Sequence, residues 1–400
     1  FMGSMLGLVL SDNVFSLFVF WELTSITSFL LIGFDHWKPE ARGAALQSLL
    51  VTGGGGLSLL AGLVLLAQAA GSVNLSAIAA SPSTSSPMLS WSAALILIGA
   101  AAKSAQVPFQ FWLPNAMTAP TPASAFLHSS TMVKAGVFVL FRLNPAFADL
   151  PWWGIALMLL GGLTALTGGW MVLRQHVLKP LLAWSTVSSL GIMVLLIGAG
   201  TPEALFAAAV FIIAHALYKA ALFLVAGIVD HASGERDTHK LGGLRRDMPI
   251  TAITATLAGL SMMGIPLTAG FVAKEVVYET LMHVPGLGFP GVLAVLLAGA
   301  SFVLVAWAVA MKPFHGEMLP TPEHPHDPAA SLFLGPLVLA ICGIAGGMVP
   351  GQMMEHAAAA SVPGGYHGAH LAPWHGMNIS LVLSAVTLSL GALADFFGFT

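Results

Sequence analysis

The stretch VLAVLLAGASFVLVAWAVAM, residues 292–311, decides the fold class because it carries no charged side chain and is apolar on every face. A helix needs about 20 such residues to cross roughly 30 Å of hydrocarbon. Residues 155–171 have the same character, and neither stretch alternates as a barrel strand would. Since 57% of residues are hydrophobic and 8% are charged, a water-soluble domain is excluded. The sequence predicts an all-α, polytopic transmembrane helix bundle.

Apolar windows separated by Pro, Gly, Ser and charged residues give the predicted spans. The chain opens on Phe1 within an apolar run, so we expect a fragment that lacks N-terminal helices. We divide it into a transmembrane core over 1–315 and additional helices with His-rich loops over 316–400. The predicted spans are 1–10 (partial), 14–34, 42–69, 91–113, 122–142, 151–173, 177–199, 203–229, 250–282, 290–311, 332–349 and 377–398.

Lysine and arginine placement predicts the orientation, because cytoplasmic loops carry the excess of positive charge. When loops are assigned alternately to two sides, one side receives nine basic residues and the other receives only Arg142. The Ser/Pro-rich loop 72–90 is therefore predicted to lie outside. The nine predicted cytoplasmic residues are Lys38, Arg42, Arg174, Lys179, Arg236, Lys240, Arg245, Arg246 and Lys312.

Four lysines remain, and all lie within predicted spans: Lys103, Lys134, Lys219 and Lys274. A lysine at the bilayer centre costs roughly 2.5–3.5 kcal/mol even on lenient insertion scales, so such residues are usually functional. Burial favours the neutral amine and a nearby carboxylate favours the ammonium, so a buried lysine can exchange protons near neutral pH. The alternative for Lys103 is a side chain that snorkels to the interface.

Each lysine has polar companions in the sequence. Glu22, with Ser25 one turn on, is the natural carboxylate partner of an intramembrane lysine, although a purely structural ion pair stays open. His128, Thr131 and Lys134 follow one another in steps of three, which predicts a ridge of donors and acceptors. A histidine satisfied within the core is the alternative for His128.

Two further pairs complete the predicted proton relay. His215 and Lys219 are four residues apart and so face the same side of a helix. Lys274 and Glu275 follow a Pro/Gly break at Gly264-Ile-Pro266. An ion pair at a helix end near the interface is the alternative for this second pair.

A weak internal repeat points to a transporter core built from two halves. WELTSITS, starting at Trp21, resembles WSTVSSLG, starting at Trp184, and both are followed by LLIG. Each copy precedes a proline-interrupted span with a lysine, Lys103 before Pro108 and Lys274 after Pro266. Paired broken helices indicate an inverted-repeat-like transporter.

Other candidates are weaker. The histidines of loops 313–330 and 355–375 have no cysteine partner and no ligand spacing, so we predict solvated loops and no metal site or cofactor. Gly53 to Gly56 lack a phosphate-loop ending and indicate close helix packing. Cys342 lies in an apolar run, no nucleophile with a base partner is present, and nothing suggests nucleic acid. We expect no enzyme activity.

The chain resembles the antiporter-like membrane subunits shared by Mrp-type cation/proton antiporters and respiratory complex I, most of all the large Mrp A subunits. The residues that carry this resemblance are FWELTS at 20–25, KSAQVPFQFWLP at 103–114, APTPASAFLHSSTMVKAG at 119–136, HALYKA at 215–220, GFVAKE at 270–275, and within the A subunits also DHASGERD at 230–237 and LGGL at 241–244.

The resemblance implies a multi-subunit antiporter in a bacterial-type inner cell membrane, exchanging protons for Na⁺ or another monovalent cation. It implies Glu22 paired with Lys103 as the coupling pair, and Lys274 as an exit-side site. It implies His128, Lys134, His215 and Lys219 as the central relay. Two alternatives stay open: a proton-pumping subunit of a redox-driven complex, and an assembly subunit whose charges only dock helices.

Overall fold

The computed structural model describes residues 1–80, 87–368 and 370–397. These residues form α-helices and short 3₁₀- and π-helical segments, with no β-strand among them. Nine helices in the described part of the chain are long and apolar enough to cross a membrane. The predicted all-α transmembrane bundle is therefore confirmed.

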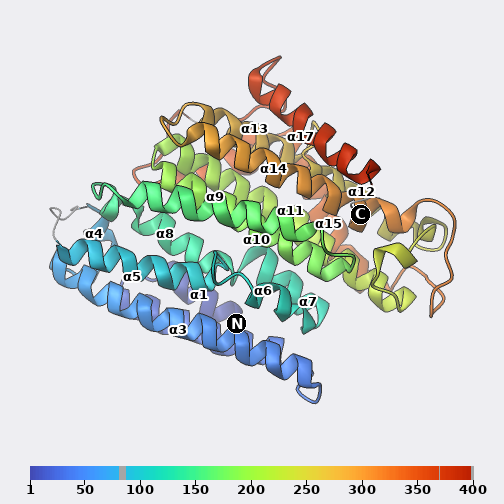
Figure 1. Ribbon diagram of the computed structural model, residues 1–400, viewed down its shortest axis with the longest axis horizontal. Helices are drawn as coiled ribbons and strands as arrows, with labels where there is room; N and C mark the ends of the chain where they lie inside the picture. The colour runs from blue at the N-terminus through green and yellow to red at the C-terminus, as the bar shows by residue number, and fades with distance from the viewer. Residues whose placement is uncertain (81–86, 369, 398–400) are drawn as a thin grey trace. The chain divides into compact units, whose positions relative to one another are not determined.

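The chain divides into two compact units, and unit 1 comprises residues 1–164 and 190–201. Helix α3 packs lengthwise against α5 (Figure 1). The contact is close because Gly62 lies against Ser92 and Ile96, and Gly99 lies against Gly55 and Leu59. The helices of this part are α1 (Met2–Leu10), α2 (Val14–Ile32), α3 (Pro39–Ala70), α4 (Leu75–Ala80), α5 (Pro87–Lys103), α6 (Trp112–Asn115), α7 (Thr121–Ala125) and α8 (Lys134–Phe147).

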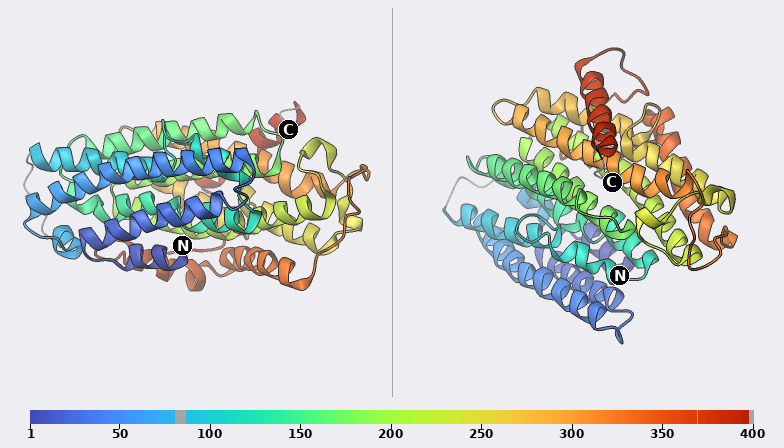
Figure 2. Two further views of the ribbon diagram at one scale, coloured as in Figure 1. Left: turned by 90° about the horizontal axis from the view of Figure 1, so that it is seen from below. Right: turned by 45° about the vertical axis from the view of Figure 1, so that its right-hand side comes forward.

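Unit 2 comprises residues 165–189 and 202–400, and α9 and α10 contribute residues to both units. Within it, α11 packs against α12, α13 and α15, while α17 packs along α14 (Figure 2). The helices are α9 (Trp153–Val172), α10 (Leu178–Ala199), α11 (Pro202–Ser233), α12 (Pro249–Met263), α13 (Ala269–Met282), α14 (Gly288–Ala306), α15 (Ala330–Met348), α16 (His356–Ser361) and α17 (Ile379–Phe396).

Both predicted helix breaks are present. Helix α5 ends at Lys103, and a non-helical stretch with Ala105 at a φ of 47° leads to α6. Helix α12 ends with Gly264 in the left-handed conformation, and α13 begins five residues later. Each break frees backbone carbonyls within the span, where another donor must satisfy them.

A third break was not predicted. The span expected to be one helix over 122–142 contains a π-helix, Phe126–Ser130, and α8 begins only at Lys134. The Ser129 and Thr131 hydroxyls donate to the carbonyls of Ala125 and Phe126 and so compete with the regular helical ladder. The predicted ridge of His128, Thr131 and Lys134 along one helix is therefore wrong, because a turn separates the histidine from the lysine.

Two segments expected to be loops carry helices. The predicted outer loop 72–90 contains α4, and its residues 81–86 lie outside the described part of the chain. The His-rich stretch contains α16 and the end of a π-helix, Gly351–Glu355. It is anchored as well, since the Leu371 amide donates to the Glu355 carboxylate at 2.6 Å, so a purely solvated loop is a wrong description.

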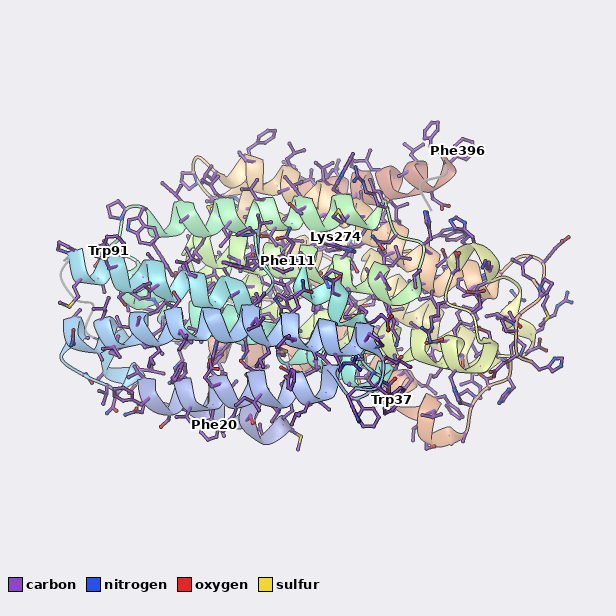
Figure 3. The ribbon with its side chains drawn as sticks, turned by 60° about the horizontal axis from the view of Figure 1, so that its bottom comes forward. Phe20, Trp37, Trp91, Phe111, Lys274 and Phe396 are labelled. Carbon is purple, nitrogen blue, oxygen red and sulfur yellow. The ribbon has the colours of Figure 1, made fainter. Side chains whose placement is uncertain are left out.

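Exposed apolar side chains cover the helices, as a lipid-facing surface requires. In unit 1, Trp37 and Trp91 lie at opposite ends of the helices (Figure 3) and are 62% and 68% exposed. Tryptophan is enriched at both membrane–water interfaces. These two residues therefore mark the predicted cytoplasmic and outer ends of unit 1.

Candidate proton-transfer site

Lys103 is the best-defined element of the site in unit 1. Its side chain is fully buried at the C-terminal end of α5. The ammonium donates to the Ser25 hydroxyl at 2.7 Å and to the Trp21 carbonyl at 2.9 Å, and it lies 4.8 Å from the Trp21 ring centroid. A serine hydroxyl can accept from an ammonium or donate to a neutral amine, so this position accommodates both protonation states.

Glu22 lies on the same helix as these partners but does not bond directly to Lys103. Among the described residues, the ion pairs do not include Glu22 with Lys103. The Glu22 carboxylate is half-buried, and its Oε1 lies against Gly56 of α3 without a hydrogen-bond partner in the described part of the chain. The expected ion pair is thus replaced by a hydroxyl and a carbonyl, with the carboxylate nearby.

Lys134 and His128 lie on either side of the third break. Lys134 donates to the Ser129 carbonyl, an acceptor that the π-helix and the following turn expose. His128 is fully buried, and its ring centroid lies 6.4 Å from that of Trp112. The break therefore creates the acceptor that holds the lysine.

Lys219 occupies in unit 2 a setting like that of Lys103 in unit 1. The ammonium donates to the Ser185 hydroxyl at 2.6 Å, and the Leu182 carbonyl lies at 3.5 Å. Ser185 directly follows Trp184, the residue that aligned with Trp21 in the internal repeat. His215 is fully buried one turn before Lys219, with its ring 5.5 Å from that of Tyr218.

Lys274 and Glu275 are neighbours in sequence but have different partners. Lys274 donates to the carbonyls of Met263 and Gly264 at 3.2 and 3.1 Å, where the end of α12 carries partial negative charge. Lys274 is labelled in Figure 3. Glu275 is 4% exposed and accepts a hydrogen bond from Ser384 of α17 at 2.8 Å.

The partners of these groups include residues that the sequence did not reveal. Ser384 and Thr387 lie on α17, outside the predicted core, and Thr387 bonds to the buried Tyr278 hydroxyl at 2.6 Å. Ser185 was visible only as part of the repeat. The spacing of Ser380, Ser384 and Thr387, which places them near one face of a largely apolar helix, was the available signal.

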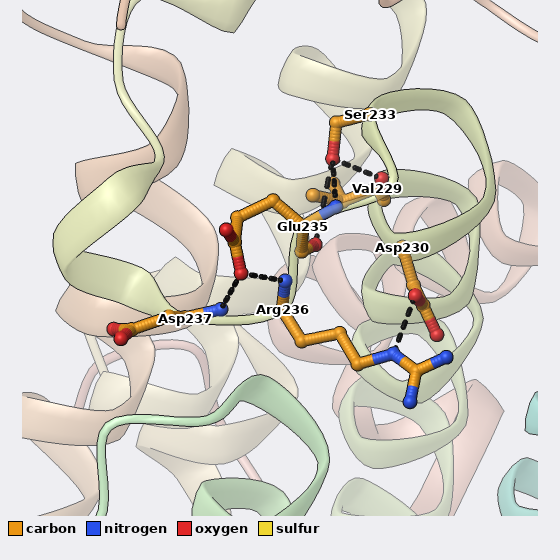
Figure 4. A network of polar contacts seen from close by, with 6 residues as sticks. All are labelled: Val229, Asp230, Ser233, Glu235, Arg236 and Asp237. Carbon is orange, nitrogen blue, oxygen red and sulfur yellow. Dashed lines mark hydrogen bonds and ion pairs between the residues drawn. The ribbon is translucent and has the colours of Figure 1, made fainter. Parts of the chain in front are cut away.

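The loop after α11, which carries part of the resemblance to the Mrp proteins, is a compact polar network (Figure 4). The Glu235 carboxylate accepts from the amides of Arg236 and Asp237, and Arg236 pairs with Asp230 at 2.7 Å. The amide of Asp237, followed by that of Arg236, lowers the pKa of Glu235. The network connects the end of α11 to the start of α10, since the Leu178 amide donates to the Arg236 carbonyl.

No group of three or more His, Cys, Asp or Glu side chains that could hold a metal ion occurs within residues 1–80, 87–368 and 370–397. Some histidines of the C-terminal region bond to the backbone or lie near another ring. The His356 ring bonds to the Gly351 carbonyl, for example, and the His370 and His375 rings are 6.3 Å apart.

Comparison with known proteins supplies the family. Residues 11–299 match the family described as NADH:quinone oxidoreductase/Mrp antiporter, transmembrane. The chain belongs to this family. The A/B subunit of a probable K⁺/H⁺ antiporter of Rhizobium meliloti is 42% identical over 98% of the chain, and the A1 subunit of a Na⁺/H⁺ antiporter of Staphylococcus haemolyticus is 40% identical over 89%.

Structural comparison agrees with the family assignment. A chain of the Mrp complex from Dietzia sp. matches with a TM-score of 0.89 and 39% identity over 98% of this chain. The predicted resemblance to the large Mrp A subunits is thereby confirmed. The chain spans 40% and 47% of the lengths of the two curated relatives, and 43% of the Dietzia chain.

Proposed function

We propose that this chain is the proton-translocating part of a membrane subunit of a monovalent cation/proton antiporter, with the lysines as the groups that gain and lose protons. The observation that carries the proposal is that Lys103 and Lys219 have the same kinds of hydrogen-bond acceptor. Among the described hydrogen bonds, each buried ammonium donates to a serine hydroxyl and to a main-chain carbonyl. Neither kind of acceptor is an anion, so these hydrogen bonds do not fix either lysine in the charged state.

In this proposal, the charge of the Glu22 carboxylate influences the protonation of Lys103 without a direct hydrogen bond to it. Its carboxylate lies close enough for electrostatic interaction with Lys103, while Ser25 and Trp21 make the hydrogen bonds. A carboxylate at this range stabilises the ammonium, and its movement or neutralisation favours release of the proton. This arrangement supports proton uptake and release at one lysine without breaking a buried ion pair.

The other proposed members of the relay are His128 and Lys134 in unit 1, and His215, Lys274 and Glu275 in unit 2. All are placed at helix breaks or along buried helix faces. Helix breaks in both units supply acceptors for Lys134 and Lys274, and transporters built from repeats have broken helices of this kind. The proposed sequence of transfers follows the sequence order Lys103, Lys134, Lys219 and Lys274.

The partners and the cation are proposed from the relatives. Since similar proteins are named as K⁺/H⁺ and Na⁺/H⁺ antiporter subunits and as part of an Mrp complex, we propose that other antiporter subunits are the partners and that Na⁺ or K⁺ is the exchanged ion. The proposed location is a bacterial-type inner cell membrane. These names favour antiport over a redox-driven pump, although the family includes both kinds.

The test is proton flux in vesicles that contain the full complex, driven in turn by a Na⁺ and a K⁺ gradient. Lys103→Ala and Lys219→Ala should each lower flux at least tenfold while the complex still assembles. Lys38→Ala is the matched control, because Lys38 is exposed and pairs with Asp35 at the surface. If Lys103→Ala and Lys219→Ala both keep wild-type flux, or if they lose assembly before flux, the proposal is contradicted. These lysines would then only hold helices together.

A further inference from the structure

Trp21 contributes two different groups to the surroundings of Lys103. Its main-chain carbonyl accepts a hydrogen bond from the ammonium at 2.9 Å, and the ammonium nitrogen lies over its indole ring, 4.8 Å from the ring centroid. Both side chains are fully buried. A cation within about 6 Å of an aromatic centroid is attracted by the ring face, most strongly by tryptophan and in a site without water.

The hydrogen bonds of Lys103 leave room for this ring contact. An ammonium has three N–H groups, and the Ser25 hydroxyl and the Trp21 carbonyl accept from two of them. The Ser25 hydroxyl itself donates to the Trp21 carbonyl at 3.3 Å. Uncharged acceptors serve an ammonium and a neutral amine alike, whereas the ring face attracts the ammonium alone. The indole, like the nearby Glu22 charge, therefore favours the protonated lysine.

The other edge of the indole lies against α3. Its Nε1 is buried, has no hydrogen-bond partner in the described part of the chain, and lies 3.3 Å from the position that a Cβ atom at Gly56 would occupy. The described contacts of the indole are thus packing against α3 and the lysine above its face. A hydrogen bond of the ring N–H does not explain why an indole is present here.

We propose that Trp21 is a positioning residue that holds the Lys103 ammonium on its ring face and so sets the pH range in which this lysine exchanges protons. The inference rests on the proposed function and adds to it a group that regulates the lysine of unit 1. Lys219 in unit 2 has similar acceptors, but its described ring contact is Tyr218, 6.0 Å away on the same helix. The two lysines therefore differ in their aromatic partner.

The test replaces Trp21 site-specifically by mono-, di- and trifluorotryptophan, which weaken the negative ring face step by step and keep the shape of the ring. The measurement is the pH profile of cation-driven proton flux by the full complex in vesicles. We expect the alkaline limb to move to lower pH with each fluorine, by about one pH unit over the series, because the ammonium is stabilised less. Complex assembly should stay normal.

Trp170 provides the matched control. Its ring carries Arg174 at 5.6 Å, but it is 60% exposed on α9 and contacts no lysine of the proposed relay in the described part of the chain. The same fluorinated residues at this position should leave the pH profile unchanged. An equal shift in both series would overturn the inference, because it would be a general effect of fluorination.

An unchanged pH profile throughout the Trp21 series would also overturn the inference. Lys103→Ala, measured beside the series, separates this failure from a failure of the proposed function. If Lys103→Ala loses flux while the fluorinated proteins keep the wild-type profile, the proposed function stands and the role of the indole alone is refuted. If Lys103→Ala keeps wild-type flux, Lys103 is not part of the relay and both are refuted.

Discussion

At the scale of single residues, the proposed mechanism depends on what touches each buried lysine. Backbone carbonyls and serine hydroxyls make the described hydrogen bonds of Lys103, and carbonyls make those of Lys274. A hydrogen bond to a charged group contributes about 1.5–3 kcal/mol, which offsets much of the cost of placing an ammonium in the membrane. In these described hydrogen bonds, Lys103 and Lys274 are held by uncharged acceptors.

The position of the Glu22 carboxylate can be tested by a substitution that removes no ionisable residue. In Gly56→Ala, the added methyl group would overlap Glu22 Oε1, so the carboxylate must move. We expect proton flux of the full complex to fall at least tenfold, because the charge that stabilises the Lys103 ammonium is displaced. Flux measurements on purified, fully assembled complex check this.

Gly54→Ala is the control for that substitution. A methyl group at Gly54 meets nothing within 4 Å, so the helix gains only a better helix former. Its flux should equal that of the wild type. Equal loss in both variants would mean that the glycines matter for the helix and not for the position of Glu22.

The sequence identified the ionisable residues of the site but not their partners. Lys103, Lys134, Lys219 and Lys274 stand out because charge within an apolar span is rare. The hydrogen bond from Lys103 to the Trp21 carbonyl could not be foreseen, since every residue has a carbonyl and only the packing of α2 on α5 selects one. The expected Glu22 ion pair was wrong for the same reason.

At the scale of helices, most of the fold was predictable. Apolar runs fixed the spans, and Pro108 and Pro266 marked two breaks, because proline cannot continue a regular helix. The break at 131–133 contains no proline or glycine. At this break, Ser and Thr hydroxyls bond to backbone carbonyls. The sequence could not predict it, because Ser and Thr make similar bonds within unbroken helices elsewhere in the chain.

The loop that precedes α15 has a defined role in holding α12. The Asp327 carboxylate accepts hydrogen bonds from the amides of Ile250 and Thr251 and from the Thr251 hydroxyl. It thus caps the N-terminus of the helix whose other end binds Lys274. We expect Asp327→Ala to lower the free energy of unfolding by about 1–2 kcal/mol. Denaturation of the purified complex in detergent measures the change.

Glu323→Ala serves as the comparison for Asp327. Glu323 lies in the same loop, and its described contacts are made by its main chain, through its amide to the Ser233 carbonyl and its carbonyl to the Thr321 hydroxyl. Its unfolding curve should match that of the wild type. If the two variants unfold alike, the capping role of Asp327 is refuted.

At the scale of the whole chain, orientation in the membrane follows from charge. Nine of the ten basic residues outside the spans fall on the predicted cytoplasmic side. On the other side, Arg142 pairs with Asp12 at 3.0 Å, and a hydrogen bond from Ser76 is the main cause that lowers the pKa of Asp12. The orientation could be predicted from the order of spans and charged loops along the chain. The packing of α17 on α13 and α14 could not be predicted in this way and is known only from the structure.

Cysteine labelling tests the orientation directly. A membrane-impermeant maleimide should label Asp149→Cys in intact cells and should label Gln175→Cys only after permeabilisation, because these positions lie in loops predicted to face opposite sides. The single native cysteine, Cys342, lies within α15 and gives the background. The reverse pattern would invert the predicted orientation.

The proposed mechanism requires that a serine hydroxyl lets a buried lysine change its protonation state. The most direct test is cation-driven proton flux of the full complex with Ser185→Ala, compared with Ser188→Ala, whose serine lies on the same helix and bonds to the Ala165 carbonyl. We predict at least a tenfold loss of flux in Ser185→Ala, with wild-type flux in Ser188→Ala and normal assembly of both. Equal flux in the two variants would contradict the mechanism.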